Sequence, residues 1–407
     1  MHKIEQLLQT LAPKGVEFRK LGEVLEYDQP NQYCVTGKEF DKSYPTPVLT
    51  AGKTFILGYT NEKDNIYQAS KSSPVIIFDD FTTATQWVDF PFKVKSSAMK
   101  ILFSKNPTIN IRFIFFYMQT IPYNIGGEHA RHWISRYSQL EVPIPPLEIQ
   151  QEIVKILDAF TELNTELNTE LKARKKQYEY YQNMLLDFNG INQNHKDAKE
   201  KLAQKPYPKR LKTLLQTLAP KGVEFRKLGE VCDFQKGKSI TKKAVTFGKV
   251  PVISGGRQPA YYHNEANRSG ETIAISSSGV YAGYVSYWDI PVFLADSFSV
   301  SPKQKTLMPK YLFHYLTTQQ DAIHATKSAG GIPHVYSKDL QNFLIPIPPL
   351  EIQQEIVKIL DQFSLLTTDL LAGIPAEIEA RKKQYEYYRE KLLTFKPLTP
   401  HKEVKKC

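Results

Sequence analysis

The feature that most constrains this chain is a stretch that occurs in it twice. Residues 143–158 read PIPPLEIQQEIVKILD, and the same letters return at 346–361. The block ARKKQYEYY at 173–181 likewise returns at 380–388. Copies this faithful inside one chain indicate a structural unit that is used twice, so the repeat has to be interpreted before any local pattern.

The repeated stretch has the pattern of a long helix. Pro145 and Pro146 suit the first turn of a helix, and Asn189 with Gly190 suits its end. Between them apolar residues recur in steps of three and four, which is the seam of a coiled coil. Such a helix would be roughly 60 Å long and needs a partner helix, which the second copy supplies.

The seam residues that we expect between the two helices are apolar or aromatic. They are Ile149, Ile153, Ile156, Phe160, Leu163, Leu167, Leu171, Tyr178 and Tyr181 in the first copy, and Ile352, Ile356, Tyr385 and Tyr388 in the second. Tyrosines at this spacing could also stack on bases, but helix contacts are the expected role.

The middle of the first helix holds a short repeat of its own. The letters TELN occur at 161–164 and again at 165–168. A four-residue insertion is a stutter in a heptad pattern, and it lengthens the rod by roughly 6 Å. The second copy has Gly373 and Pro375 in this region, where we expect a kink or a break.

Both halves of the chain follow one plan. Residues 7–24 return unchanged at 214–231, ahead of each globular body. The segment between the halves is rich in Lys and Asn and is expected to be an exposed, mobile linker. The predicted domains are a first recognition domain at 1–142, a helix with TELN repeats at 143–190, a linker at 191–213, a second recognition domain at 214–345 and a C-terminal helix at 346–396.

The two bodies have diverged while their outlines still match. PVLTAGK at 47–53 parallels PVISGGR at 251–257, and strand-like VIIF at 75–78 parallels TIAI at 272–275. The predicted fold class is therefore mixed α/β, of the α+β kind. It has two globular domains separated by a long antiparallel two-helix coiled coil, with an internal pseudo-twofold repeat.

Composition points to a polyanionic partner. The formal net charge is +11, which favours nucleic acid but is weak evidence alone. The aromatic-rich run at 113–118 is far too short to cross a bilayer, so no membrane partner is expected. The three cysteines are widely spaced, as isolated thiols in a reducing cytoplasm would be.

A shared rod that carries two diverged bodies suits duplex DNA, where two half-sites present equivalent faces. The loops of both bodies contain side chains that bond base edges and phosphates. The candidates are Lys53, Thr82, Thr83, Gln86, Trp87, Arg131 and Arg136 in the first body, and Arg257, Ser276, Ser277, Ser278, Tyr281, Lys327 and His334 in the second. Any one of them alone is better explained as a solvated loop residue, so the prediction depends on the set and not on its members.

Catalytic and metal-binding motifs are missing. Asp79 and Asp80 are expected to form a turn at a strand end, because a metal site needs more oxygen ligands than these two. The nine histidines form no ligand-spaced pair on a helix. We therefore expect neither catalytic residues nor a metal ion in this chain.

The duplicated PIPPLEIQQEIV motif, the GVEFRKLGEV segment before each body and the TELN repeats resemble the DNA-specificity (S) subunit of type I restriction–modification systems. The resemblance covers nearly the whole chain. It implies a non-catalytic subunit whose two target recognition domains read the halves of a split DNA sequence. It also implies that the number of tetrapeptides alters the gap between the halves.

The resemblance further implies the partners. They are double-stranded DNA, two methyltransferase (M) subunits and restriction (R) subunits. The chain itself would hold no cofactor, while its partners would bring S-adenosylmethionine, ATP and Mg²⁺.

Two other functions stay open on the residues alone. A duplicated coiled-coil adaptor between proteins explains the rod, but leaves the diverged bodies and the net charge unexplained. An enzyme with an unfamiliar site would show turnover by the isolated chain.

Overall fold

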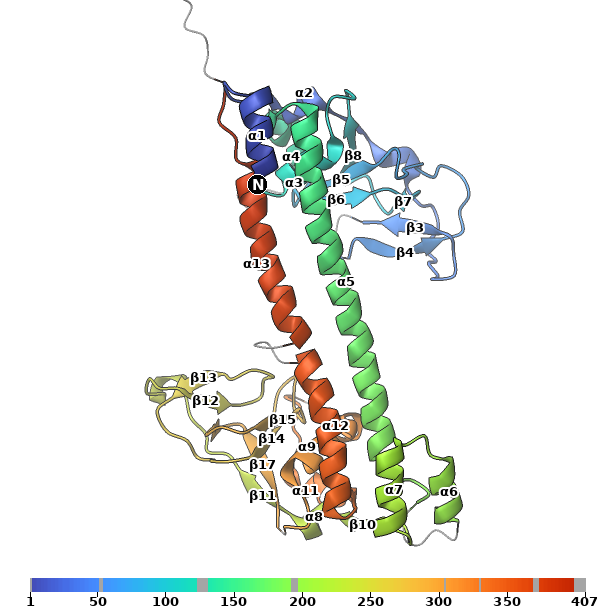
Figure 1. Cartoon of the computed structure of the whole chain (residues 1–407), viewed down its shortest axis with the longest axis vertical. Helices are drawn as coiled ribbons and strands as arrows, with labels where there is room; N and C mark the ends of the chain where they lie inside the picture. The colour runs from blue at the N-terminus through green and yellow to red at the C-terminus, as the bar shows by residue number, and fades with distance from the viewer. Residues whose placement is uncertain are drawn as a thin grey trace, which may run out of the picture. The chain divides into compact units, whose positions relative to one another are not determined.

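A computed structural model describes residues 2–50, 54–122, 131–191, 197–303, 305–328, 331–368 and 373–398 (Figure 1). The chain forms two compact units. The first unit comprises Met1–Leu167 with Ile378–Cys407, and the second unit comprises Asn168–Glu377. Each unit therefore contains one body together with helix segments that come from both copies of the repeated stretch.

The first body is built on two small sheets. The larger is antiparallel, in the order β2 (Leu25–Asp28), β8 (Met99–Ser104), β5 (Val75–Asp79), β6 (Thr85–Val88). The smaller has the order β4 (Ile56–Thr60), β3 (Thr46–Leu49), β7 (Lys93–Val94). All five residues of β5 are buried, the four apolar residues and the terminal Asp79.

The second body repeats this topology. Its larger sheet has the order β11 (Cys232–Lys236), β17 (Ser297–Pro302), β14 (Thr272–Ser276), β15 (Val285–Trp288). Its smaller sheet has the order β13 (Tyr261–His263), β12 (Val250–Ile253), β16 (Phe293–Leu294). In both bodies the smaller sheet has one antiparallel and one parallel pair. The predicted mixed α/β class is confirmed.

A two-stranded sheet joins the entrance and the exit of each body. Strand β1 (Glu17–Lys20) pairs with β9 (Glu141–Ile144), and β10 (Glu224–Lys227) pairs with β18 (Leu344–Ile347). The remaining short helices and 3-10 turns are α1 (His2–Leu11), α2 (Leu21–Val24), η1 (Pro30–Tyr33), α3 (Ile111–Met118), α4 (His132–Ser135), η2 (Tyr137–Gln139), α6 (Ala198–Gln204), α7 (Lys209–Leu218), α8 (Leu228–Val231), η3 (Lys242–Ala244), α9 (Pro309–Thr318), α10 (Gln320–Ala325) and α11 (Ser337–Leu340).

The repeated stretch is helical, as predicted. Helix α5 (Leu147–Leu186) begins directly after Pro146, and α12 (Leu350–Thr368) begins directly after Pro349. The predicted break in the second copy is confirmed, because α13 (Gly373–Leu393) is a separate helix. Gly373 has a φ of +76°, and a Cβ there would lie 2.6 Å from the Leu365 carbonyl oxygen. Any larger residue at this position would be strained.

Equivalent aromatic pairs join the helix segments of each unit. In the first unit Phe160 stacks on Tyr388 with ring centroids 5.6 Å apart, and in the second Phe363 stacks on Tyr181 at 5.0 Å. The segments of α5 and α13 in the first unit run in opposite directions (Figure 1). The expectation that these tyrosines contact the partner helix is confirmed.

The seam of the first helix differs in one position from the prediction. Ile149, Ile153 and Leu157 are fully buried in the core of the first unit, whereas Ile156 is only half-buried. The reason is that this part of α5 contacts the body as well as a helix, so it has two apolar stripes. In the TELN region the seam residues Leu163, Leu167 and Leu171 are half-buried.

The segment between the halves is more ordered than predicted. Within it α6 and the start of α7 are helical, and Leu202 and Tyr207 are buried. The Tyr207 hydroxyl donates a hydrogen bond of 2.6 Å to the Asp187 carbonyl oxygen. The expectation of an exposed linker is wrong at these residues, because their apolar surface is covered by the second unit's core.

Two further expectations concern the chain as a whole. Among the described helices, none has both the length and the apolar character required to cross a membrane. Cys34 and Cys232 are free thiols, and Cys407 lies outside the described residues.

Candidate nucleic-acid interface

The turn between β5 and β6 presents two of the predicted residues of the first body. Asp79 shapes this turn, since its Oδ1 accepts a 2.9 Å hydrogen bond from the Phe81 N–H and its Oδ2 accepts the Thr82 hydroxyl at 2.5 Å. Thr83 has a φ of +59°, which continues the tight turn. Thr82 is exposed, and so is Gln86 on β6, so both can contact a ligand.

Arg131 and Arg136 flank helix α4 and are both exposed. The backbone of α4 is fixed by Asp80, whose carbonyl oxygen accepts the His132 N–H at 2.9 Å and whose Oδ1 accepts the Trp133 N–H at 3.0 Å. Neighbouring residues Asp79 and Asp80 thus place the β5–β6 turn and α4 at one end of β5. The prediction that this pair forms a turn is confirmed. The described residues contain no group of acidic, His or Cys side chains that could hold a metal ion.

Two predicted residues of the first body stand apart from this group. The centroids of the Trp87 and Phe115 rings lie 5.7 Å apart, and the Arg112 guanidinium lies 4.5 Å from the centroid of the Trp87 ring. Trp87 therefore contributes to the attachment of α3 rather than to the β5–β6 turn. Lys53 lies outside the described residues.

In the second body the three predicted serines lie at the end of β14, with Ser276 as its last residue. Ser276 is buried and donates to the Ser254 carbonyl oxygen at 3.1 Å, so its hydroxyl has a structural partner. Ser277 and Ser278 are half-buried; the Ser278 hydroxyl donates to Asp296, and the backbone of Ser278 pairs with that of His334.

The remaining predicted residues of the second body lie on the same loops. Arg257 is exposed and its guanidinium lies 5.0 Å from the Tyr281 ring centroid. The Lys327 amine donates to the Val280 carbonyl oxygen at 3.5 Å, and the His334 and Tyr336 rings stack at 5.9 Å. The loops at the end of β14 therefore gather cations, hydroxyls and aromatic faces.

A pocket of about 480 Å³ opens among these loops. Its wall includes Lys236, Ser277, Asp296, His334 and Tyr336. Asp296 was not predicted, and its exposed carboxylate could accept a hydrogen bond from a base amino group. The signal for it in the sequence is slight, a single Asp between two apolar runs.

Each body is attached to its long helix by the same contacts. The Gln150 side chain accepts the Asn110 N–H at 2.8 Å and donates to the Thr108 carbonyl oxygen at 3.2 Å. Gln353 does the same with the Met308 N–H at 2.9 Å and the Thr306 carbonyl oxygen at 2.8 Å. Both glutamines are fully buried.

An ion pair reinforces each attachment. Arg112 contacts Asp158 at 2.8 Å, and Lys310 contacts Asp361 at 2.6 Å. Burial acts to raise the pKa of Asp361, but hydrogen bonds from His314 and Lys310 outweigh it and hold the pKa below its usual value. The two loop groups are thus carried on bodies that are firmly fixed to α5 and α12.

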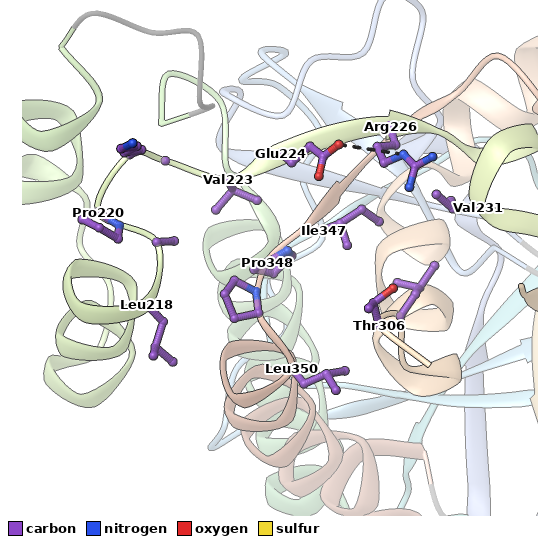
Figure 2. A pocket seen from close by; sticks show the side chains of 15 residues that line it. Leu218, Pro220, Val223, Glu224, Arg226, Val231, Thr306, Ile347, Pro348 and Leu350 are labelled. Carbon is purple, nitrogen blue, oxygen red and sulfur yellow. Dashed lines mark ion pairs between the residues drawn. The ribbon is translucent and has the colours of Figure 1, made fainter. Parts of the chain in front are cut away.

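A separate groove of about 510 Å³ lies where α7, β10 and the start of α12 meet in the second unit (Figure 2). Figure 2 shows Leu218, Pro220, Ile347 and Leu350 around it, with Arg226 near its upper side. All of these labelled residues belong to segments that occur twice in the chain. The groove is therefore built mostly from repeated segments, and Thr306 and Leu307 are its lining residues from the body itself.

Comparison with known proteins gives one consistent result. The family described as "Type I restriction modification DNA specificity domain" matches residues 13–176 and 220–380. The chain is 39% identical to the type I restriction enzyme EcoR124I/EcoR124II specificity subunit of Escherichia coli, over 98% of this chain and 99% of the relative. The solved S subunit of a type I restriction–modification system from M. genitalium has a TM-score of 0.62 at 17% identity, and the match covers 93% of this chain and 95% of that one. That structure shows a likeness of fold.

Proposed function

The chain belongs to the type I restriction–modification DNA specificity family, and we propose that its two bodies each read one half of a split DNA target. As a member of this family it is a non-catalytic DNA-recognition subunit. The observation that supports two-part reading is the contrast inside the chain. The bodies share one topology and one attachment to the helices, while their loops differ.

The DNA contacts are proposed at the loops that follow β5 and β14. Thr82, Gln86, Arg131 and Arg136 would serve the first half-sequence. Arg257, Ser278, Tyr281, Lys327 and His334 would serve the second. Exposed Arg and Lys neutralise phosphates, while Arg, Gln and Ser can also bond base edges in the major groove. The domain limits given above, 1–142 and 214–345, would then be the two reading modules.

The repeated segments are proposed to bind two copies of one partner, the methyltransferase (M) subunit. An identical surface that occurs twice in a chain offers the same site twice, and the groove of Figure 2 is built mostly from such residues. Restriction (R) subunits would complete the assembly. S-adenosylmethionine, ATP and Mg²⁺ would be bound by these partners, in the cytoplasm.

Helix α5 is proposed to set the gap between the half-sequences. One TELN unit corresponds to roughly 6 Å of helix, against about 3.4 Å per base pair, so one unit changes the gap by only one or two base pairs. Deletion of residues 165–168 should keep both half-sequences and shorten the gap. Altered half-sequences after that deletion would contradict this role of the helix.

The experiment that tests the function is genome-wide mapping of methylated adenines in cells that co-express the chain with a methyltransferase subunit. One split motif with a fixed gap is the expected result. If a complex forms and methylates DNA without any motif, the adaptor function is correct instead.

A further inference from the structure

The first body buries an ion pair at the end of its central strand. Asp80 directly follows β5 and is 0% exposed, and Lys100 of β8 is 2% exposed. The Lys100 Nζ lies 3.6 Å from the Asp80 Oδ2, donates to the Gln29 side-chain oxygen, and lies 4.7 Å from the Tyr27 ring centroid. Lysine is almost never buried to this extent unless it is paired.

Strand register identifies the residues that take these positions in the second body. Phe78 pairs with Lys100 across β5 and β8, as Ile275 pairs with Phe298 across β14 and β17. Two residues after Phe78 and Ile275, just beyond the strand ends, the chain has Asp80 and Ser277. Their carbonyl oxygens accept equivalent hydrogen bonds, from the His132 N–H and the Val335 N–H, both at 2.9 Å. Lys100 and Asp80 thus correspond to Phe298 and Ser277.

Stability alone does not require the ion pair in this fold. The second body fills the Lys100 position with a fully buried phenylalanine, so the same strands accept an apolar side chain there. Buried ion pairs are often no more stabilising than hydrophobic residues of similar volume. Burial lowers the pKa of Lys100, and the neighbouring Asp80 acts in the opposite direction. The pair needs another explanation.

The contacts of Asp80 supply an explanation for the ion pair. Its carboxylate accepts the Trp133 N–H at 3.0 Å, and its carbonyl accepts the His132 N–H, so Asp80 fixes the first turn of α4. Arg131 immediately precedes that turn. On the other side, Asp79 fixes the Thr82 turn. Lys100 on β8 pairs with the Asp80 carboxylate. Gln29, just after β2, accepts a hydrogen bond from Lys100 and so helps to hold the lysine in place.

We propose that the Asp80–Lys100 pair positions α4 against the β5–β6 turn and so determines how the first body reads its half-sequence. Neither residue contacts DNA in this role. Lys100 holds the Asp80 carboxylate, the carboxylate holds the α4 backbone, and Arg131 and Arg136 flank α4. The inference rests on the proposed function, to which it adds two buried residues that determine specificity.

The test is a double substitution, Asp80→Ser with Lys100→Phe, which installs the residues of the second body and leaves no unpaired charge. The full chain is co-expressed with the methyltransferase subunit and its methylation motif is mapped. We expect a folded complex that keeps the second half-sequence and the gap. Its preference for the first half-sequence should fall about tenfold at one or more bases, the loss of about one base contact.

Val75→Ala is the matched control. Val75 is buried at the other end of β5, so its truncation lowers the stability of the same body without touching Asp80 or α4. This variant should methylate the unchanged motif. If it relaxes the first half-sequence as much as the double variant does, loss of stability explains both results and the proposal is wrong.

Asp80→Asn is the second variant, in case the double variant does not fold. It keeps an acceptor for the Trp133 N–H but removes the charge that holds Lys100, so it should relax the first half-sequence by a smaller factor. An unchanged first half-sequence in the folded double variant, or in Asp80→Asn if only that one folds, overturns the proposal. Absence of any motif with the unaltered chain would instead refute the proposed function, so the two failures are distinguishable.

Discussion

Two buried lysines of the first body stand where the second body has phenylalanines. Lys93 pairs with Val48 across β7 and β3, as Phe293 pairs with Val252 across β16 and β12, and the second exchange is Lys100 for Phe298. All four side chains are nearly fully buried. Strand order is the same in both bodies, and so is the register at these two positions, so the topology does not depend on their chemistry.

The partners of these side chains differ accordingly. Lys93 forms a 3.0 Å ion pair with Glu62, whereas the Phe293 ring meets the His263 ring edge-on at 5.4 Å. An ion pair fixes direction through hydrogen bonds, while an apolar ring mainly fills volume. The difference teaches that this fold can diverge inside its bodies, and not only in its loops, without losing its strand pairing.

The largest effect is expected from making the two bodies alike. Replacement of residues 25–142 by a second copy of residues 232–345 should remove the first half-sequence and put the second half-sequence in its place. The flanking strands and Gln150 accept either body, since both bodies offer the same backbone groups. Preference for the original first half-sequence should fall by about 10³ or more. Methylation mapping measures this, and a retained first half-sequence would show that the reading residues lie outside the body.

A large loss of stability is expected when the buried Asp80–Lys100 ion pair is broken. Lys100→Met leaves Asp80 buried without its cation and should cost about 3–5 kcal/mol in the free energy of unfolding. Phe298→Met at the equivalent position should cost only about 1.5 kcal/mol, because one apolar side chain replaces another. Urea unfolding of both variants compares them. Equal losses would mean that Lys100 contributes only volume.

A smaller difference is expected at the attachment to the long helices. The Arg112 side chain is 18% exposed and lies over the rings of Trp87, Phe115 and Phe116, whereas that of Lys310 is 37% exposed and lies near one ring. Arg112→Ala should cost about 2 kcal/mol and Lys310→Ala about 0.5 kcal/mol in the free energy of unfolding. Thermal unfolding measures both losses. Lys155→Ala, at an exposed position on α5, serves as the control variant.

The last expected difference is an acid dependence that Glu62 contributes to the first body. A hydrogen bond from the Gly37 N–H, with others from Lys93 and Thr36, lowers the pKa of Glu62 from 4.5 to about 2, although burial opposes this. A lowered pKa in the folded state means that the stabilisation is complete above pH 4.5 and is lost as the pH falls toward 2. The stability difference between the unaltered chain and Glu62→Gln should therefore shrink between pH 7 and pH 3 in urea titrations. A difference that stays constant over this range would contradict it.

The parts of the fold that sequence predicted are those encoded by the repeat. Phe160, Tyr181 and Tyr388 were predicted as seam residues and do contact a partner helix, and the structure adds Phe363, the repeat equivalent of Phe160, as the partner of Tyr181. The start of α5 and the break at Gly373 followed from backbone properties of proline and glycine, which act locally.

The buried pair of the first body could not be predicted in this way. Asp80 lies in the turn after β5 and Lys100 lies on β8, and neither is unusual in its local sequence. Only the register of β5 and β8 brings them together. A lysine within the apolar letters MKILF is the one signal present, and it does not name a partner. Most of the candidate DNA contacts share this difficulty, because loops join residues that are distant in sequence.

Gln150 and Gln353 hydrogen-bond to backbone atoms of their bodies, the N–H of Asn110 or Met308 and the carbonyl of Thr108 or Thr306. Every amino acid in such a position offers the same carbonyl, and every one except proline offers the same N–H. Substitutions in a body, or its replacement as a gene segment, therefore require no compensating mutation at this glutamine. The buried glutamine is an attachment point that is indifferent to which module it holds.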